Sequence, residues 1–149
     1  MKNGYKQVVV LLVEDNEDEA ELAIRELKKH NLANDLLWVK DGEEALEFIF
    51  GTGRYEGRDV ECPPKVILLD LKMPKIDGIE VLRAVRNDER TKKIPVVVLT
   101  SSNEEKDIVS AYELGVNSYI VKPIDFQKFS SSIKDIGYYW LVLNKTVQK

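Results

Sequence analysis

The chain has 149 residues, and its 22 Lys and Arg residues against 26 Asp and Glu residues give a net charge of −4. This length suits one domain with a substantial hydrophobic core, and the negative charge argues against a nucleic-acid partner. One cysteine excludes an internal disulfide, and no cluster of Cys and His could form a zinc site. Because no apolar run approaches the ~20 residues that cross a bilayer and the start does not resemble a signal peptide, we expect a cytoplasmic protein with no membrane partner.

Short apolar runs recur along the chain and predict five β-strands. Three strong runs, rich in β-branched residues, lie at residues 8–13, 66–69 and 96–99. Two weaker runs lie at residues 36–39 and 119–121. Because the strong runs do not alternate with polar residues, we expect these strands to be covered on both faces, as they are in a parallel sheet.

Between and after the strands, apolar residues recur at spacings of three and four, which is typical of one buried helix face. The helices expected from this spacing lie at about residues 17–30, 45–50, 79–85, 108–114 and 126–143. Strand and helix therefore alternate five times. This order predicts a flavodoxin-like, doubly wound α/β fold with a five-stranded parallel sheet in the order 2-1-3-4-5.

Three segments fall outside this regular alternation. Residues 1–7 are expected to form an N-terminal tail, residues 8–136 the domain, and residues 137–149 an extension of the last helix. The loop at residues 51–64 is longer than most loops in compact domains, so it is either functional or merely mobile.

Chemically active side chains follow four of the five predicted strands. Glu14 and Asp15 follow the first strand, Asp70 follows the third, Thr100 follows the fourth, and Lys122 follows the fifth. Because the carboxyl ends of parallel strands meet at one edge of the sheet, we expect these five side chains to converge there.

The three carboxylates of this set predict a metal site. Two carboxylates ~4 Å apart repel by roughly 4 kcal/mol at an effective dielectric constant of 20, so gathering three of them requires a cation. Oxygen ligands without His or Cys favour Mg²⁺, and the alternative is a group of unpaired surface acids. The acids and amide that come next are interpreted as the capped start of a helix: Asn16, Glu17 and Asp18.

Asp70 is the candidate nucleophile of the site. A carboxylate at the end of a rigid strand, beside Mg²⁺, can attack phosphorus and form an acyl phosphate. Phosphoryl transfer chiefly requires positioning and charge compensation, which Lys122 could supply as a cation and Thr100 as a hydroxyl donor. The segment after Asp70 predicts a turn fixed by Pro74 and a helix start at Asp77-Gly78.

Taken as an ordered set, these motifs resemble the pattern of response-regulator receiver domains of the stand-alone, chemotaxis-regulator type. The resemblance covers about residues 8–136 and rests on Glu14-Asp15, Asp70 with Met73-Pro74 and Asp77-Gly78, Thr100-Ser101, and Lys122-Pro123. It implies a single-domain response regulator of a two-component phosphorelay, which accepts a phosphoryl group from a histidine kinase and signals by protein–protein contacts. It implies no enzymatic activity beyond self-phosphorylation and autodephosphorylation.

The resemblance also implies the metal site. Asp70 would be the phospho-acceptor, and Asp15 and Asp70 would ligate Mg²⁺ together with the backbone carbonyl of Lys72. Glu14 would complete the acidic pocket, although the family more often has Asp at that position. The Lys72 side chain could pair with the phosphoryl group, pair with Glu14, or point to solvent. Lys72 and Ser102 occupy positions where the family varies, so the lifetime of the phosphate stays open.

Three further residues have roles implied by the resemblance. Thr100 would be the switch hydroxyl that closes on the phosphoryl group, and Tyr119 would be the switch aromatic that turns inward with it. Lys122 would pair with the phosphoryl oxygens, and its bond to Pro123 resembles a cis peptide of the family.

Two other functions remain open at this stage. One is a receiver-like binding module that works without phosphorylation. The other is a phosphohydrolase with an Asp nucleophile, but such enzymes typically need a second acid two residues after the nucleophile, where this chain has Lys72.

The end of the chain predicts an interface. Tyr139, Trp140 and Leu143 belong to a helix that is apolar nearly all round, which favours a homodimer contact over longer packing against the helix's own core. This Tyr- and Trp-rich end and the long loop before the third strand also resemble, more loosely, receivers paired with bacterial phytochrome-type histidine kinases.

Overall fold

The computed structural model describes residues 8–29, 35–123, 127–128 and 131. Strands and helices alternate along the described chain. The strands are β1 (Val10–Val13), β2 (Leu36–Val39), β3 (Val66–Leu69), β4 (Val96–Thr100) and β5 (Ser118–Val121). The helices of the described residues are α1 (Glu17–Lys29), α2 (Gly42–Phe50), α3 (Gly78–Arg86) and α4 (Glu105–Glu113), and the 3₁₀ helix η1 (Gly53–Tyr55) follows α2.

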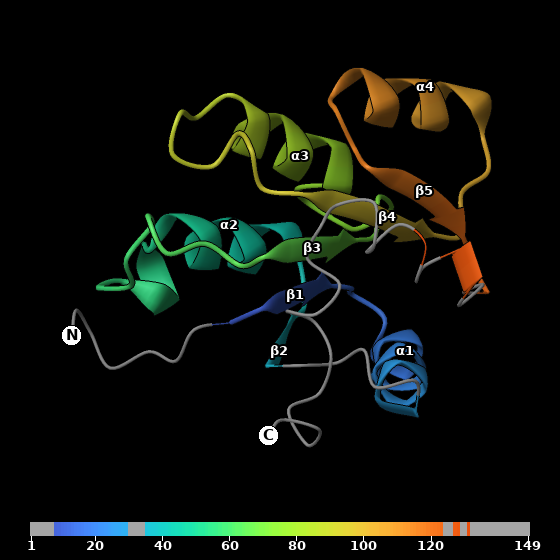
Figure 1. Ribbon diagram of the computed structural model, residues 1–149, viewed down its shortest axis with the longest axis horizontal. Coiled ribbons are helices and arrows are strands. Elements are labelled where there is room, and N and C mark those ends of the chain that lie inside the picture. Colours follow the sequence, from blue (N-terminus) through green and yellow to red (C-terminus); the bar gives the residue numbers. More distant parts are fainter. Residues whose placement is uncertain (1–7, 30–34, 124–126, 129–130, 132–149) are drawn as a thin grey trace.

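All five strands form one parallel sheet in the order β2-β1-β3-β4-β5, which confirms the predicted topology. Figure 1 shows α2, α3 and α4 over one face of the sheet and α1 against the other. Side chains of β1 alternate between the two layers, with Leu11 and Val13 in the larger core and Val10 and Leu12 beside α1. The strand sequences lack alternation because both faces of the sheet are covered.

The helix starts follow the predicted capping chemistry. The Asn16 side chain accepts the backbone N–H of Glu19 at 2.9 Å, which is the N-cap contact of α1. Asp77 and Glu80 form a reciprocal capping box at the start of α3, which confirms the helix start expected at Asp77-Gly78. Gly78 is required there by close packing, because a Cβ would lie 2.4 Å from the carbonyl oxygen of Asp70.

Two helices begin one turn earlier than the apolar spacing predicted. The first turns of α2 and α4 are polar and acidic, so they carry no apolar periodicity. Acidic side chains stabilise a helix N-terminus through its dipole, and Asp41 also caps α2 by accepting the N–H of Glu44. The apolar pattern marks only the buried part of each helix.

The long loop after α2 is packed against that helix. The buried guanidinium of Arg58 donates to the carbonyl oxygens of Phe48 at 2.8 Å and Cys62 at 2.7 Å. It also lies over the Phe48 ring, 4.0 Å from the centroid, and Tyr55 packs edge-on against the same ring. The sequence left open whether this loop is functional or merely mobile. The contacts instead give it a structural role, because they pack it against α2.

Several predictions fall outside the described residues. They concern the tail at residues 1–7, most of the fifth helix and the extension at residues 137–149. They also concern the predicted interface residues, which are Tyr139, Trp140 and Leu143. The domain boundaries and the homodimer contact therefore stay predictions. Among the helices of the described ranges, none combines the length and apolar character needed to span a membrane.

Candidate functional site

The predicted carboxylates meet at the carboxyl edge of the sheet. Carboxylate oxygens of Glu14, Asp15 and Asp70, one from each residue, all lie within 4.8 Å of one another. They come together because β1 and β3 are neighbours in register, with Val13 aligned to Leu69, so the residues that follow each strand lie side by side. The convergence expected from the strand ends is found for this trio.

Glu14 is held in place from several directions. It is 4% exposed, its Oε2 accepts the N–H of Asn16 at 3.1 Å, and its carbonyl oxygen accepts the indole N–H of Trp38 at 2.8 Å. Burial raises the pKa of Glu14 to about 7; the hydrogen bond from Lys122 opposes this rise, and the neighbouring Asp70 adds to it. The pocket is therefore one in which negative charge is costly without a nearby cation.

Lys122, directly after β5, is the cation that the structure places in the pocket. Its ammonium donates to Oε1 of Glu14, lies 2.8 Å from Oε1 of Glu19, and lies 3.7 Å from Oδ2 of Asp70. Burial alone would lower the pKa of Lys122, but the hydrogen bonds to Glu14 and Glu19 raise it above its ordinary value. The peptide bond to Pro123 is cis, as the sequence resemblance implied.

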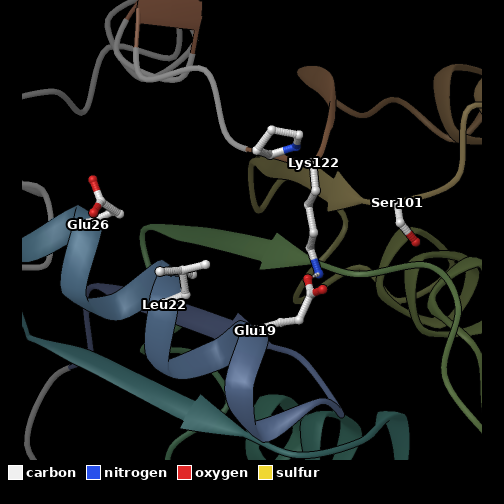
Figure 2. Close-up of a pocket in the computed structure, with 7 residues that line it drawn as sticks. Glu19, Leu22, Glu26, Ser101 and Lys122 are labelled. Carbon is white, nitrogen blue, oxygen red and sulfur yellow. Dashed lines mark ion pairs between the residues drawn. The ribbon is translucent and has the colours of Figure 1, made fainter.

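A cavity of about 620 Å³ borders this ion pair on the α1 side. Figure 2 shows the Lys122 side chain reaching from the end of β5 toward the Glu19 carboxylate, with Leu22 and Glu26 further along α1. Glu19 was not singled out from the sequence, where it stood only as one of several acids at a helix start. Its contact with Lys122 makes it part of the charge balance of the site.

Thr100 and Tyr119 lie beneath the loop that joins β4 to α4. Thr100 is completely buried, and its Oγ1 accepts the N–H of Ser102 at 3.3 Å. The Tyr119 hydroxyl donates to the carbonyl oxygen of Ser102 at 2.9 Å, so the ring points inward. Burial raises the pKa of the Tyr119 hydroxyl, which keeps it a proton donor. Both residues therefore contact Ser102, through different backbone atoms.

Lys72 has a partner that sequence reasoning missed. Its backbone N–H donates to Oδ1 of Asp70 at 3.2 Å, while its ammonium lies 3.1 Å from Oδ2 of Asp107 in α4. The side chain is 54% exposed and pairs with Asp107, a partner that was not considered from the sequence. Nothing in the sequence singles out Asp107, which directly precedes the helix expected at residues 108–114, and an acid at a helix start is usually accounted for by the helix dipole.

The donor set fits Mg²⁺. The cluster of Glu14, Asp15 and Asp70 offers only carboxylate oxygens, and Asp15 is exposed, so an ion can approach from solvent. Hard oxygen ligands of this kind suit Mg²⁺ or Mn²⁺. The backbone carbonyl of Lys72 remains a predicted fourth ligand.

Known proteins share this architecture. A family model described as the response regulator receiver domain matches residues 10–134. The response regulator Rcp1 of Synechocystis sp. is 38% identical over 133 residues, which are 89% of this chain and 88% of that protein. The structure of the bacteriophytochrome response regulator AtBRR is 47% identical, with a TM-score of 0.79, and the match covers 91% of this chain and 96% of AtBRR.

Two further solved structures are informative about the site. The Mn²⁺-bound form of Rcp1 is 38% identical, with a TM-score of 0.71, over 95% of this chain and 97% of that one. The phosphorylated cyanobacterial phytochrome response regulator RcpA is 38% identical, with a TM-score of 0.69, over 91% of this chain and 95% of that one. Because the family model spans most of the chain and these relatives match over nearly their whole length, this protein belongs to the response regulator receiver family and is a response regulator of a two-component signalling system.

Proposed function

We propose that Asp70 accepts a phosphoryl group from a sensor histidine kinase in a Mg²⁺-dependent reaction. One observation carries this proposal: Asp70 is 6% exposed at the rigid end of β3, with two further carboxylates within 4.8 Å and the Lys122 ammonium 3.7 Å away. A nucleophile, a cation site and a charge-compensating ammonium therefore occupy one pocket. Receiver domains take phosphoryl groups from histidine kinases, and the phosphorylated structure of RcpA supports the same chemistry here.

In the proposed reaction a carboxylate oxygen of Asp70 attacks the phosphorus of a phosphohistidine. A phosphorus–oxygen bond forms, the phosphorus–nitrogen bond breaks, and the electron pair of that bond leaves with the histidine nitrogen. Asp15 and Asp70, with the backbone carbonyl of Lys72, would hold Mg²⁺, and Glu14 would complete the acidic pocket. The bound ion supplies charge compensation for the transferring oxygens. The N–H of Lys72 orients Asp70 by donating to its Oδ1.

Phosphorylation would then change the partners of the surrounding side chains. A phosphoryl group adds about two negative charges, so the Lys122 ammonium is drawn from Glu14 toward the phosphoryl oxygens. The Thr100 hydroxyl donates to the same oxygens. The backbone of Ser102 is hydrogen-bonded to both Thr100 and Tyr119. A movement of Thr100 would therefore displace the β4–α4 loop and, with it, the switch aromatic Tyr119.

The signal would be read by a protein that contacts the surface of α4 and β5. Val109 and Tyr112, three residues apart on α4, and Val121 on β5 are exposed apolar side chains. Such residues at a surface that changes with phosphorylation suit a docking site. A homodimer through Tyr139, Trp140 and Leu143 is the second contact that we propose.

The nature of the kinase is a finer part of the proposal. The neighbouring structures AtBRR and RcpA are described as a bacteriophytochrome and a phytochrome response regulator. The first of these is 47% identical to this chain over most of its length. We therefore propose a phytochrome-type histidine kinase as the phosphodonor and the cytoplasm as the location of the reaction.

The proposed function is tested by incubating the protein with acetyl phosphate and Mg²⁺, followed by phosphate-affinity electrophoresis. The wild type is expected to give a retarded band that EDTA abolishes, and Asp70→Asn to give none. Asp18→Asn, the same change at an exposed acid of α1, is the matched control and should shift like the wild type. No retarded band in the wild type would favour a binding module, and rapid release of phosphate over many turnovers would favour a phosphohydrolase.

A further inference from the structure

Asp107 joins two loops of the site that are distant in sequence. Its Oδ2 accepts the hydroxyl of Ser102 at 2.6 Å and lies 3.1 Å from the ammonium of Lys72. One carboxylate oxygen on α4 therefore serves both the loop after β3 and the loop after β4. The Asp107 side chain is 13% exposed, whereas the Lys72 side chain is 54% exposed, so the lysine is the more solvent-accessible partner of the pair.

We propose that Asp107 is a positioning residue that holds the Lys72 ammonium away from Asp70 and thereby shortens the lifetime of the phosphoryl group on Asp70. This inference rests on the proposed function, because it concerns the phosphorylated form of Asp70. It assigns a role to a residue outside the acidic pocket and outside the motifs by which the site was found in the sequence.

Lys72 is close enough to Asp70 to contact a phosphoryl group there. Its backbone nitrogen lies 3.2 Å from Oδ1 of Asp70, and a lysine side chain is a flexible four-carbon stem with three rotatable donors. The same stem that now reaches Asp107 can turn toward oxygens added at Asp70. The position of the ammonium is therefore decided by competition between Asp107 and the phosphoryl group.

The charges of the pair favour the observed contact. The hydrogen bond to Asp107 raises the pKa of Lys72, and the hydrogen bonds from Ser102 and Lys72 outweigh partial burial and lower the pKa of Asp107. Both partners are thus ionised near neutral pH. The Ser102 hydroxyl also donates to Asp107 and holds this carboxylate in place. The Lys72 ammonium can therefore bind either to Asp107 or to the phosphoryl group on Asp70.

The position of Lys72 affects hydrolysis of the acyl phosphate. In this step the oxygen of a water molecule bonds to phosphorus, the bond from phosphorus to the Asp70 oxygen breaks, and inorganic phosphate and the free carboxylate are released. An ammonium on the phosphoryl oxygens stabilises the phosphorylated form and hinders the approach of water. When Asp107 holds the ammonium, that protection is absent and the phosphate is lost faster.

The test uses the full chain phosphorylated with acetyl phosphate and Mg²⁺, then freed of the phosphodonor by desalting with Mg²⁺ retained. The decay of the retarded band in phosphate-affinity electrophoresis gives the rate of hydrolysis. Asp107→Asn is expected to lengthen the half-life about fivefold, as one added charge-assisted hydrogen bond would. Asn can still accept the Ser102 hydroxyl, so the loop contact is preserved.

Three further variants show whether Asp107 acts through Lys72. The half-life of the double variant Lys72→Gln, Asp107→Asn should equal that of Lys72→Gln, because Asp107 has no ammonium to hold once Lys72 is replaced. Asp107→Glu, which can restore the ion pair, should return the half-life toward the wild-type value. Glu105→Gln removes one charge from the same turn of α4 and is the matched control, with no change expected.

The results separate this inference from the function on which it rests. A phosphorylated wild type whose half-life is unchanged or shortened by Asp107→Asn would overturn the positioning role alone. The positioning role would also be overturned if Asp107→Asn lengthened the half-life equally in the presence and in the absence of Lys72. The substitution would then act through Ser102 or through the helix and not through Lys72. No phosphorylation of the wild type would overturn the proposed function and this inference together.

Discussion

The ammonium of Lys122 is hydrogen-bonded to Glu14 and lies 3.7 Å from Oδ2 of Asp70, so it contacts two of the three carboxylates of the acidic pocket. Lys122 therefore neutralises part of the negative charge of the acidic pocket that a bound metal ion would otherwise neutralise. A cation that neutralises the pocket must also weaken the attraction of the pocket for Mg²⁺. This relationship between Lys122 and Glu14 leads to the first prediction.

Lys122→Gln is expected to bind Mg²⁺ roughly tenfold more tightly than the wild type, because a competing positive charge is removed. The same variant should be phosphorylated less, since the phosphoryl oxygens lose their cation. Isothermal titration with Mg²⁺ measures the first effect, and phosphate-affinity electrophoresis the second. Lys92→Gln, at a surface lysine paired with Glu89, is the control. Weaker Mg²⁺ binding in Lys122→Gln would show that Lys122 supports the metal site instead of competing with it.

Trp38 is expected to position the metal site through the backbone. Its indole N–H donates to the carbonyl oxygen of Glu14 at 2.8 Å, and Trp38→Phe removes this donor while keeping an aromatic ring. The loss should cost about 1 kcal/mol of unfolding free energy and weaken Mg²⁺ binding several-fold. Urea unfolding and Mg²⁺ titration measure the two effects. A variant that loses stability but binds Mg²⁺ like the wild type would limit Trp38 to a structural role.

Gly78 is expected to tolerate no side chain. A Cβ at this position would lie 2.4 Å from the carbonyl oxygen of Asp70 and 2.6 Å from the Cα of Leu71. Gly78→Ala should therefore destabilise the fold by about 1–3 kcal/mol and slow phosphorylation, because the backbone at Asp70 must shift. Thermal unfolding and the rate of band retardation test this, with Arg83→Ala on the exposed face of α3 as control. Unchanged stability in Gly78→Ala would contradict the close packing.

Arg58 is expected to affect stability without affecting the site. Arg58→Met leaves the carbonyl oxygens of Phe48 and Cys62 without the guanidinium donor, which should cost about 2 kcal/mol of unfolding free energy. The contacts of the loop are with α2 and not with the acidic pocket. Phosphorylation of Arg58→Met with acetyl phosphate should therefore proceed at the wild-type rate below the melting temperature of the variant. A clear loss of phosphorylation in the folded variant would give the long loop a part in function.

The sequence predicted the parts of the molecule that depend on local pattern. Unbroken apolar runs marked the strands, helical spacing marked the helices, and the rule that parallel strands end at one edge brought Glu14, Asp15 and Asp70 together. These signals depend on chain order and burial alone. They were sufficient for the five strands and for the carboxylate cluster, whereas the sheet order is the usual one for a chain in which strand and helix alternate five times.

The missed contacts have a common physical cause. Asp107 with Lys72, Glu19 with Lys122, and Trp38 with the carbonyl of Glu14 each join elements that are distant in sequence. Such pairs depend on how each helix is rotated and where each loop ends, which apolar spacing does not determine. Arg58 is a similar case, because a charged residue in a polar loop gives no sign that it is buried.

The central claim, that Asp70 is the phospho-acceptor, is tested most directly by locating the modified residue. The protein is phosphorylated with acetyl phosphate and Mg²⁺, the acyl phosphate is reduced with borohydride, and peptides are analysed by mass spectrometry. Reduction converts a phosphorylated aspartate to homoserine, and we predict homoserine at position 70, dependent on Mg²⁺. Homoserine at another position, or none in a protein shown to carry phosphate, would contradict the account.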